Sequence, residues 1–120
     1  MSNFKDLVVW QKARAFIKKM YDMTALFPSS EVYGITSQLR RASISIANNI
    51  VEGSTRPSTK EFNRFLDIAF GSAVEVENLL YISFDLSFVD SDQLETCLED
   101  NIELQRMIKG LSKAITTKPT

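Results

Sequence analysis

Apolar residues recur along this chain in alternating steps of three and four, which is the spacing of an amphipathic helix. Four stretches carry the repeat, and turn-forming residues separate them. The pattern predicts helices at residues 4–27, 31–52, 59–88 and 91–115. Because the connections are short, each helix folds back on its neighbour. The expected fold is therefore all-α, an antiparallel up-down-up-down four-helix bundle in one domain spanning 1–120.

The predicted boundaries depend on residues that start or stop helices. Pro28 stops the first helix, and Gly53 suits the C-terminal end of the second. Caps precede the other helices: Ser29 and Ser30, the Ser58–Glu61 capping box and the Asp90–Gln93 pair. Gly71 lies in mid-helix, where glycine is unfavourable, so we expect a close helix crossing there. The polar tail, 116–120, is expected to fray.

We expect the core to form from one stripe per helix. The stripes are Trp10, Ala13, Ile17, Met20, Thr24 and Phe27; Ile35, Leu39, Ala42, Ile46 and Asn49; Phe62, Leu66, Ala69, Ala73, Val76, Leu80 and Ser83; and Leu94, Cys97, Asn101, Leu104, Ile108, Leu111 and Ile115. Further apolar residues lie off the stripes: Val8, Val9, Phe16, Ile44, Val51, Phe70, Val74, Tyr81, Phe84 and Phe88. If exposed, these predict self-association. Wide stripes that bury them in the monomer are the alternative.

Composition removes most catalytic chemistry from consideration. The chain has 120 residues, no histidine and one cysteine, so it lacks a Cys/His zinc site, a disulfide framework and a histidine-based triad. The acids at Glu75–Glu77 and 99–103 lack the histidines of a di-iron bundle. Asp90–Asp92 lacks the glycine and glutamate of a calcium loop. We expect no enzyme, no metal and no cofactor, with Cys97 in the core.

The sequence also carries no predicted signal for membranes or export. Lys5, Asp6, Gln11 and Lys12 interrupt the N-terminal apolar stretch, so no signal peptide is expected. No apolar run is long enough to span a bilayer. A lone thiol fits a reducing compartment. We expect a cytoplasmic protein without a membrane partner.

Charge is divided unevenly along the chain, although the formal net charge is −1. Residues 1–64 carry ten Lys and Arg against five acids, a net charge of +5, and residues 65–120 carry four against ten, a net charge of −6. This polarity suits a polyanion partner or head-to-tail contact between copies of the chain. Solvated helix faces that differ in sign are the alternative.

Six cations form a candidate nucleic-acid interface. Lys5, Lys12 and Lys19 recur every seven residues on one outward line of the first predicted helix, and a ridge of this kind can follow a phosphate backbone. The full predicted set is Lys5, Lys12, Lys18, Lys19, Arg40 and Arg41. Solvation or ion pairing of outer lysines is the alternative.

A second candidate site consists of uncharged and charged polar residues near the end of the second helix. Asn49 lies on the apolar stripe, where a buried asparagine commonly fixes the register of a bundle. Glu52 lies four residues after Asn48 and four before Arg56, so these groups can meet along one helix face. We predict that all four form a structural polar network. A ligand site is the alternative.

The order of residues resembles a known family. Residues 37–53, SQLRRASISIANNIVEG, with VWQKA at 9–13, FP at 27–28 and EVYG at 31–34, are similar to the bacterial four-helix bundle family that includes the 23S rRNA intervening-sequence proteins. Accessory variability determinants of diversity-generating retroelements are relatives of this family. Further matches are Arg56, Lys60–Phe62, Phe65–Leu66, Ile68–Ala69 and Gly71–Ser72. The resemblance thus covers nearly the whole chain.

The resemblance implies a homopentamer around a central axis, without known catalysis. The retroelement relatives resemble basic barrels that bind nucleic acid and a reverse transcriptase, whereas this chain has a pI near 5.4. The leading expectation is a non-catalytic pentamer that binds structured RNA or DNA through its basic surface. The alternative is a scaffold or accessory factor that docks a protein, such as a reverse transcriptase, without direct nucleic-acid binding.

Overall fold

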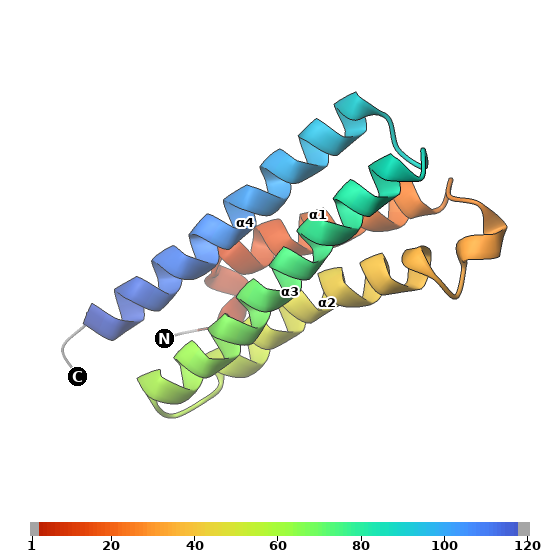
Figure 1. Ribbon diagram of the computed structural model, residues 1–120. Coiled ribbons are helices and arrows are strands. Elements are labelled where there is room, and N and C mark those ends of the chain that lie inside the picture. Colours follow the sequence, from red (N-terminus) through yellow and green to blue (C-terminus); the bar gives the residue numbers. More distant parts are fainter. Residues whose placement is uncertain (1–2, 118–120) are drawn as a thin grey trace.

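The computed structural model describes residues 3–117, and within this range the chain forms four α-helices and no strand (Figure 1). The helices are α1 (Val8–Thr24), α2 (Ile35–Ser54), α3 (Thr59–Asp85) and α4 (Ser91–Thr117), with short 3₁₀ helices η1 (Phe4–Asp6) and η2 (Ser29–Glu31). Successive helices run antiparallel. The α1–α2 and α3–α4 connections lie at one end, and the α2–α3 connection lies at the other. The predicted four-helix bundle is confirmed.

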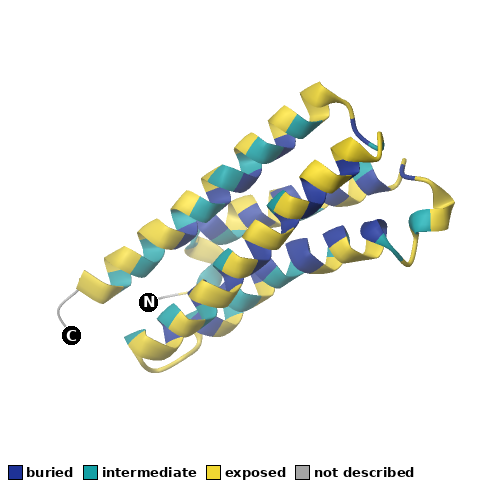
Figure 2. Ribbon diagram, viewed as in Figure 1, coloured by how far each residue is buried: buried dark blue, intermediate teal, exposed yellow. Residues whose placement is uncertain are grey.

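The core lies where the inward faces of the four helices meet (Figure 2). On α3, every predicted stripe position from Phe62 to Ser83 is buried. On α4, Cys97, Asn101, Leu104 and Ile108 are buried as predicted. A helix packed on one side buries one strip. The strip of α4 is buried in its middle, while the predicted stripe residues Leu94, Leu111 and Ile115 are only half-buried.

On α1, the buried strip differs from the predicted stripe. Val9 and Phe16 are buried, whereas Trp10 and Ile17 lie half-buried at the edge of the core. Part of the predicted apolar surplus is therefore inside the monomer, as the wide-stripe alternative expects. The members of that surplus that remain exposed are Val8, Val74, Tyr81 and Phe84.

The buried asparagine is on α4, not on α2. Ile50 occupies the core position predicted for Asn49, which is only half-buried. Asn101 is fully enclosed, and its Nδ2 donates to the backbone carbonyl of Ala73 on α3 at 3.0 Å. A buried amide needs such a partner, so Asn101 fixes the alignment of α3 with α4.

The first predicted helix, 4–27, is interrupted at its start and shorter at its end. Leu7 has an extended backbone with ψ of 119°, which separates η1 from α1 and leaves Lys5 outside α1. At the other end, the Thr24 hydroxyl accepts a hydrogen bond from Nε of Arg40 at 2.9 Å. Helix α1 therefore ends at Thr24, and Pro28 is not the residue that terminates it.

The second helix begins later than the predicted range, 31–52. The Oε1 atom of Glu31 accepts the backbone N–H of Ile35 at 3.5 Å. This carboxylate therefore reaches the first turn of α2, and the helix has no side-chain cap from Ser29 or Ser30.

Two glycines have roles opposite to those predicted. Gly53 lies inside α2, which continues to Ser54, and an added Cβ would lie 2.9 Å from the side chains of Phe62 and Phe65 on α3. Gly71 is open, with no atom within 4 Å of an added Cβ. The close crossing is at Gly53, and Gly53 does not terminate the helix.

The third helix ends at Asp85 instead of residue 88. Ser87 has a φ of 64°, and the amide of Phe88 donates to the carbonyl of Ser83 at 2.9 Å. This geometry is a Schellman motif, which closes the last turn. The fourth helix extends to Thr117 beyond its predicted end, and residues 118–120 of the predicted frayed tail lie outside the described residues.

The predicted caps of α3 and α4 are present. The amide of Gln93 donates to Oδ1 of Asp90 at 2.8 Å, and the amide of Asp90 donates to Oε1 of Gln93 at 3.0 Å. Ser58 Oγ accepts the amide of Glu61 at 3.2 Å and donates to its carboxylate. The reciprocal bond of this second box therefore uses the Ser58 hydroxyl instead of the predicted Ser58 amide.

Candidate nucleic-acid interface

Two of the predicted interface lysines connect α1 to α4. Lys12 Nζ lies 2.8 Å from Oε1 of Glu103, and Lys19 Nζ lies 2.6 Å from Oδ2 of Asp100. The hydrogen bond to Asp100, together with its negative charge, raises the pKa of Lys19. These contacts agree with the ion-pairing alternative, in which the lysine charges are matched within the chain.

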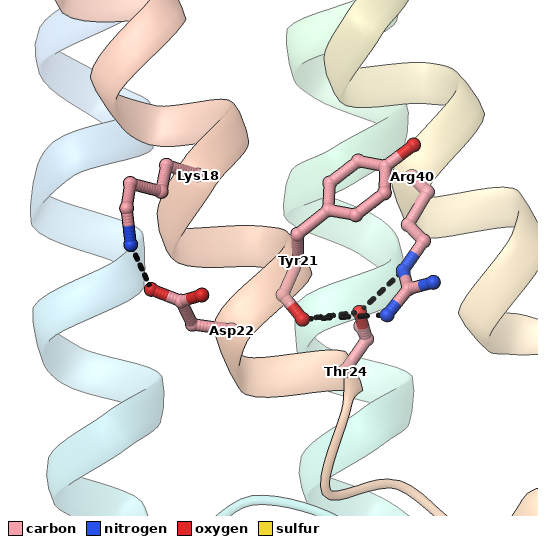
Figure 3. Close-up of polar contacts among 5 residues, drawn as sticks. All are labelled: Lys18, Tyr21, Asp22, Thr24 and Arg40. Carbon is pink, nitrogen blue, oxygen red and sulfur yellow. Dashed lines mark hydrogen bonds and ion pairs between the residues drawn. The ribbon is translucent and has the colours of Figure 1, made fainter.

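The other two predicted lysines, Lys18 and Lys5, contact residues close to them in sequence. Lys18 Nζ lies 2.8 Å from Oδ2 of Asp22, one turn along α1 (Figure 3). Lys5 lies on η1, where its carbonyl accepts from Nε2 of Gln11 at 2.8 Å. The predicted line of three lysines is therefore wrong at Lys5, because the extended Leu7 breaks the helical spacing.

Arg40 anchors α2 to the last turn of α1. Its Nη2 donates to the Tyr21 carbonyl at 3.3 Å, in addition to the bond from Nε to Thr24 (Figure 3). The guanidinium also lies 4.4 Å from the centre of the Tyr21 ring. Arg40 is half-buried in these contacts, which hold its guanidinium against α1.

Arg40 lines an open groove of about 590 Å³ that runs along the outer face of α2. Arg41 lines the groove and is exposed, and it forms no ion pair among residues 3–117. Ser37, Asn48 and Glu52 lie on the same face at helical spacing. The structure thus brings Arg40 and Arg41 together in one concave surface, separate from the paired lysines of α1.

The predicted polar network divides into separate parts. Glu52 Oε2 pairs with Nη2 of Arg56 at 3.3 Å. Asn49 Nδ2 instead donates to the Ser45 carbonyl at 2.8 Å and to its hydroxyl at 3.0 Å. Asn48 is exposed and bonds to none of these groups within residues 3–117. A single network is therefore wrong, because Asn49 bonds to Ser45 within its own helix while Glu52 pairs with Arg56.

Cys97 behaves as a core residue. Burial raises the pKa of its thiol, and its Sγ lies 3.8 Å from Sδ of Met23. Across residues 3–117, no three His, Cys, Asp or Glu side chains gather into a group that could hold a metal ion. In the same part of the chain, no helix is long and apolar enough to cross a membrane.

Sequence reasoning missed most of the groove. Besides the predicted Asn49, its further lining residues are Tyr21, Val32, Thr36, Ile44 and Ser45. The spacing of Ser37, Arg41, Asn48 and Glu52 along one helix face was visible in the sequence. The contributions of Tyr21 and Val32 were not, because only the packing of α1 and the α1–α2 connection brings them to α2.

Comparisons with known proteins place the chain in a family. A crystal structure of a protein of unknown function from the S23 ribosomal protein family of Bacteroides thetaiotaomicron matches with a TM-score of 0.79 and 24% identity, covering 88% of this chain and 99% of that chain. No curated protein matches the sequence. The model of the family described as 23S rRNA-intervening sequence protein matches residues 5–110. This chain belongs to the 23S rRNA-intervening sequence protein family.

Proposed function

We propose that this protein is a non-catalytic homo-oligomer that binds nucleic acid, structured RNA or DNA, through the groove face of α2. The observation that carries this proposal is an exposed arginine without an ion pair, Arg41, beside the immobilised guanidinium of Arg40 in the groove. The groove lies on residues 37–53, the segment with the most specific resemblance to the family. The family name itself refers to ribosomal RNA.

Binding through this face depends on electrostatic attraction between the arginine guanidinium and the phosphate groups of the nucleic acid. An arginine offers several N–H donors in a fork that matches phosphate oxygens. Each phosphate contact releases counterions, so affinity falls as salt concentration rises. With Lys12, Lys18 and Lys19 already paired, few phosphates are contacted, and the expected salt dependence is shallow.

Fluorescence anisotropy tests the proposal, using structured RNA, duplex DNA and single strands at low and near-physiological salt. Arg41→Gln should weaken binding several-fold while leaving the thermal melt unchanged. Arg106→Gln is the matched control, because it removes an equally exposed arginine from α4. Equal binding by wild type and Arg41→Gln would overturn the proposed surface.

Charge reversal at Lys12 or Lys19 is a poor test of the same question. A glutamate at either position would face Glu103 or Asp100 at close range. The resulting repulsion would destabilise the contact between α1 and α4. Loss of binding in such variants would then report on folding instead of on phosphate contact.

The oligomeric part of the proposal has its own support and its own test. Val74 and Tyr81 on α3 are 42% and 47% exposed, although both are apolar. An outer helix face of this kind is stabilised when another chain covers it. Sedimentation velocity should give a pentamer, the assembly that the family resemblance implies, and a monomer at micromolar concentration would overturn it.

A protein-docking scaffold is the second candidate, and an apolar surface that adjoins the groove at Val32 favours it. Leu26, Val32 and Tyr33 at the α1–α2 connection are 84%, 51% and 95% exposed. Large apolar side chains exposed to this degree commonly mark interaction surfaces. If no nucleic acid binds even at low salt, this end of the bundle becomes the leading site and its partner is a protein.

A further inference from the structure

The groove on α2 differs from a surface that follows a duplex. Among residues 3–117, Arg41 is the cation of the groove that has no ion pair or hydrogen bond, while Arg40 is bound to α1. A duplex backbone presents a phosphate at every step, and proteins that follow it need a series of free cations. The groove offers one phosphate site instead, next to side chains that recognise hydrogen-bonding groups.

The distance along the groove suits a nucleotide. Arg41 and Asn48 are seven residues apart, about 10 Å along the helix axis at 1.5 Å per residue. Glu52 continues the same line one turn further. The half-buried side chain of Ile44 lies between these positions and also lines the groove, so an apolar surface is available for the face of a base.

The far end of the groove offers a carboxylate that accepts hydrogen bonds. An ionised carboxylate only accepts hydrogen bonds, and Glu52 is exposed at this position. Its Oε2 contacts Arg56, and within residues 3–117 Oε1 accepts no hydrogen bond. Glu52 also lies near the C-terminus of α2, where the helix dipole disfavours a negative charge, and its ion pair with Arg56 offsets part of this cost.

Among the common bases, guanine alone presents two adjacent donors, N1–H and the N2 amino group, on its Watson–Crick edge. We propose that the groove binds one unpaired guanine nucleotide of a loop or single strand, with a phosphate at Arg41, the base over Ile44 and its Watson–Crick edge at Asn48 and Glu52. This inference rests on the proposed function and specifies the nucleic acid. Unpaired bases are accessible in this way because their edges are not hidden by a partner strand.

A set of three RNA hairpins tests the inference by fluorescence anisotropy. All share one stem and an adenine loop, and one loop position carries guanine, inosine or adenine. Inosine keeps N1–H and lacks the N2 amino group. The guanine hairpin should bind roughly tenfold more tightly than the adenine hairpin, since a good pair of contacts to a base edge discriminates to about this extent. The inosine hairpin should lie between them.

Variants assign the contacts. Glu52→Gln should bring the guanine-to-adenine affinity ratio close to one without weakening the adenine hairpin. Arg56→Gln is the matched control, because it removes the same ion pair and retains the carboxylate, so the ratio should persist. Arg41→Gln should weaken all three hairpins by the same factor.

The outcomes separate this inference from the proposed function. If the three hairpins bind equally and Arg41→Gln weakens them all, the guanine site is wrong and nucleic-acid binding by α2 remains. If no hairpin, duplex or single strand binds, both are wrong. If Arg56→Gln abolishes the guanine preference as Glu52→Gln does, the effect belongs to the ion pair, and the proposed base contact is wrong.

Discussion

Gly53 lies where the end of α2 crosses the start of α3, and the crossing leaves no room for a side chain. A Cβ there would lie 2.9 Å from Phe62 and from Phe65, which is closer than these carbon atoms can approach. We expect Gly53→Ala to destabilise the protein by about 1–3 kcal/mol, the usual cost of overpacking a core. Urea denaturation monitored by circular dichroism measures this change.

Gly71 provides the matched control for that substitution. It is exposed in mid-α3 with open space around an added Cβ. Gly71→Ala should therefore stabilise the protein by about 1 kcal/mol through helix propensity alone. If the two alanine variants shift stability in the same direction, the close crossing at Gly53 is not what determines its effect.

Ser87 is the one non-glycine residue with positive φ within residues 3–117. Side chains other than glycine are strained in this left-handed conformation. Ser87→Gly should raise stability by about 0.5–1 kcal/mol, because glycine adopts the C-terminal position of a Schellman motif without that strain. Ser87→Ala should give no such gain in a thermal melt, and a gain equal to that of glycine would contradict the explanation.

At the scale of the elements, ion pairs lie along the contact between α1 and α4. The Lys19–Asp100 pair joins residues far apart in sequence, and both side chains are partly exposed. A double-mutant cycle with Lys19→Met and Asp100→Asn should give a coupling energy of about 0.2–1 kcal/mol, as is usual for exposed pairs. High salt should reduce it.

The pH dependence of this coupling has a definite sign. The pKa of Lys19 is higher in the folded protein than in the unfolded chain. Its stabilising contribution is therefore complete below the ordinary lysine value of about 10.4 and is lost as the pH rises through the folded value. A coupling energy that increases above pH 10.4 would contradict the assigned ion pair.

How well the sequence predicts the buried face of each helix depends on the other apolar residues of that helix. The stripe of α3 is correct because it keeps one helical register from Phe62 to Ser83, a longer run than the competing apolar residues of the same helix, Phe70 to Phe84, provide. On α1, Val9 and Trp10 are adjacent and both apolar, so periodicity alone does not decide which is central. Packing against α2 and α4 decides it, and the smaller residue is buried.

The candidate site was predictable only where it lies on one helix. Arg40 and Arg41 were identified because they are adjacent on α2. The ion pairs of Lys12 and Lys19 could not be predicted in this way, because their partners, Glu103 and Asp100, come from the far end of the chain. No local pattern connects such residues, so these pairs are apparent only in the tertiary structure.

At the scale of the whole molecule, the reactivity of Cys97 reports how often the helix bundle opens, because the chain has one cysteine. It is buried, with a raised thiol pKa, and a thiol reagent modifies it when the bundle opens. If the bundle opens as one unit, Gly53→Ala should accelerate labelling by the factor that its stability loss predicts. Labelling by Ellman's reagent, followed by absorbance, measures this rate.

Gly53 lies on α2 and Cys97 lies on α4. A substitution at Gly53 therefore changes the labelling rate of Cys97 only if the whole bundle opens as one unit. Gly71→Ala should slow the same reaction. An unchanged labelling rate in Gly53→Ala would mean that the contact between α1 and α4 opens independently of the other two helices.

The pairing of Lys12 and Lys19 with α4 also determines how quickly a partner can be captured. Charges matched within a protomer cancel at a distance, so they give little long-range attraction toward a polyanion. Association should then proceed at the ordinary rate of about 10⁵–10⁷ M⁻¹s⁻¹ set by orientation, without electrostatic acceleration. Partners would then differ mainly in their dissociation rates from the protein.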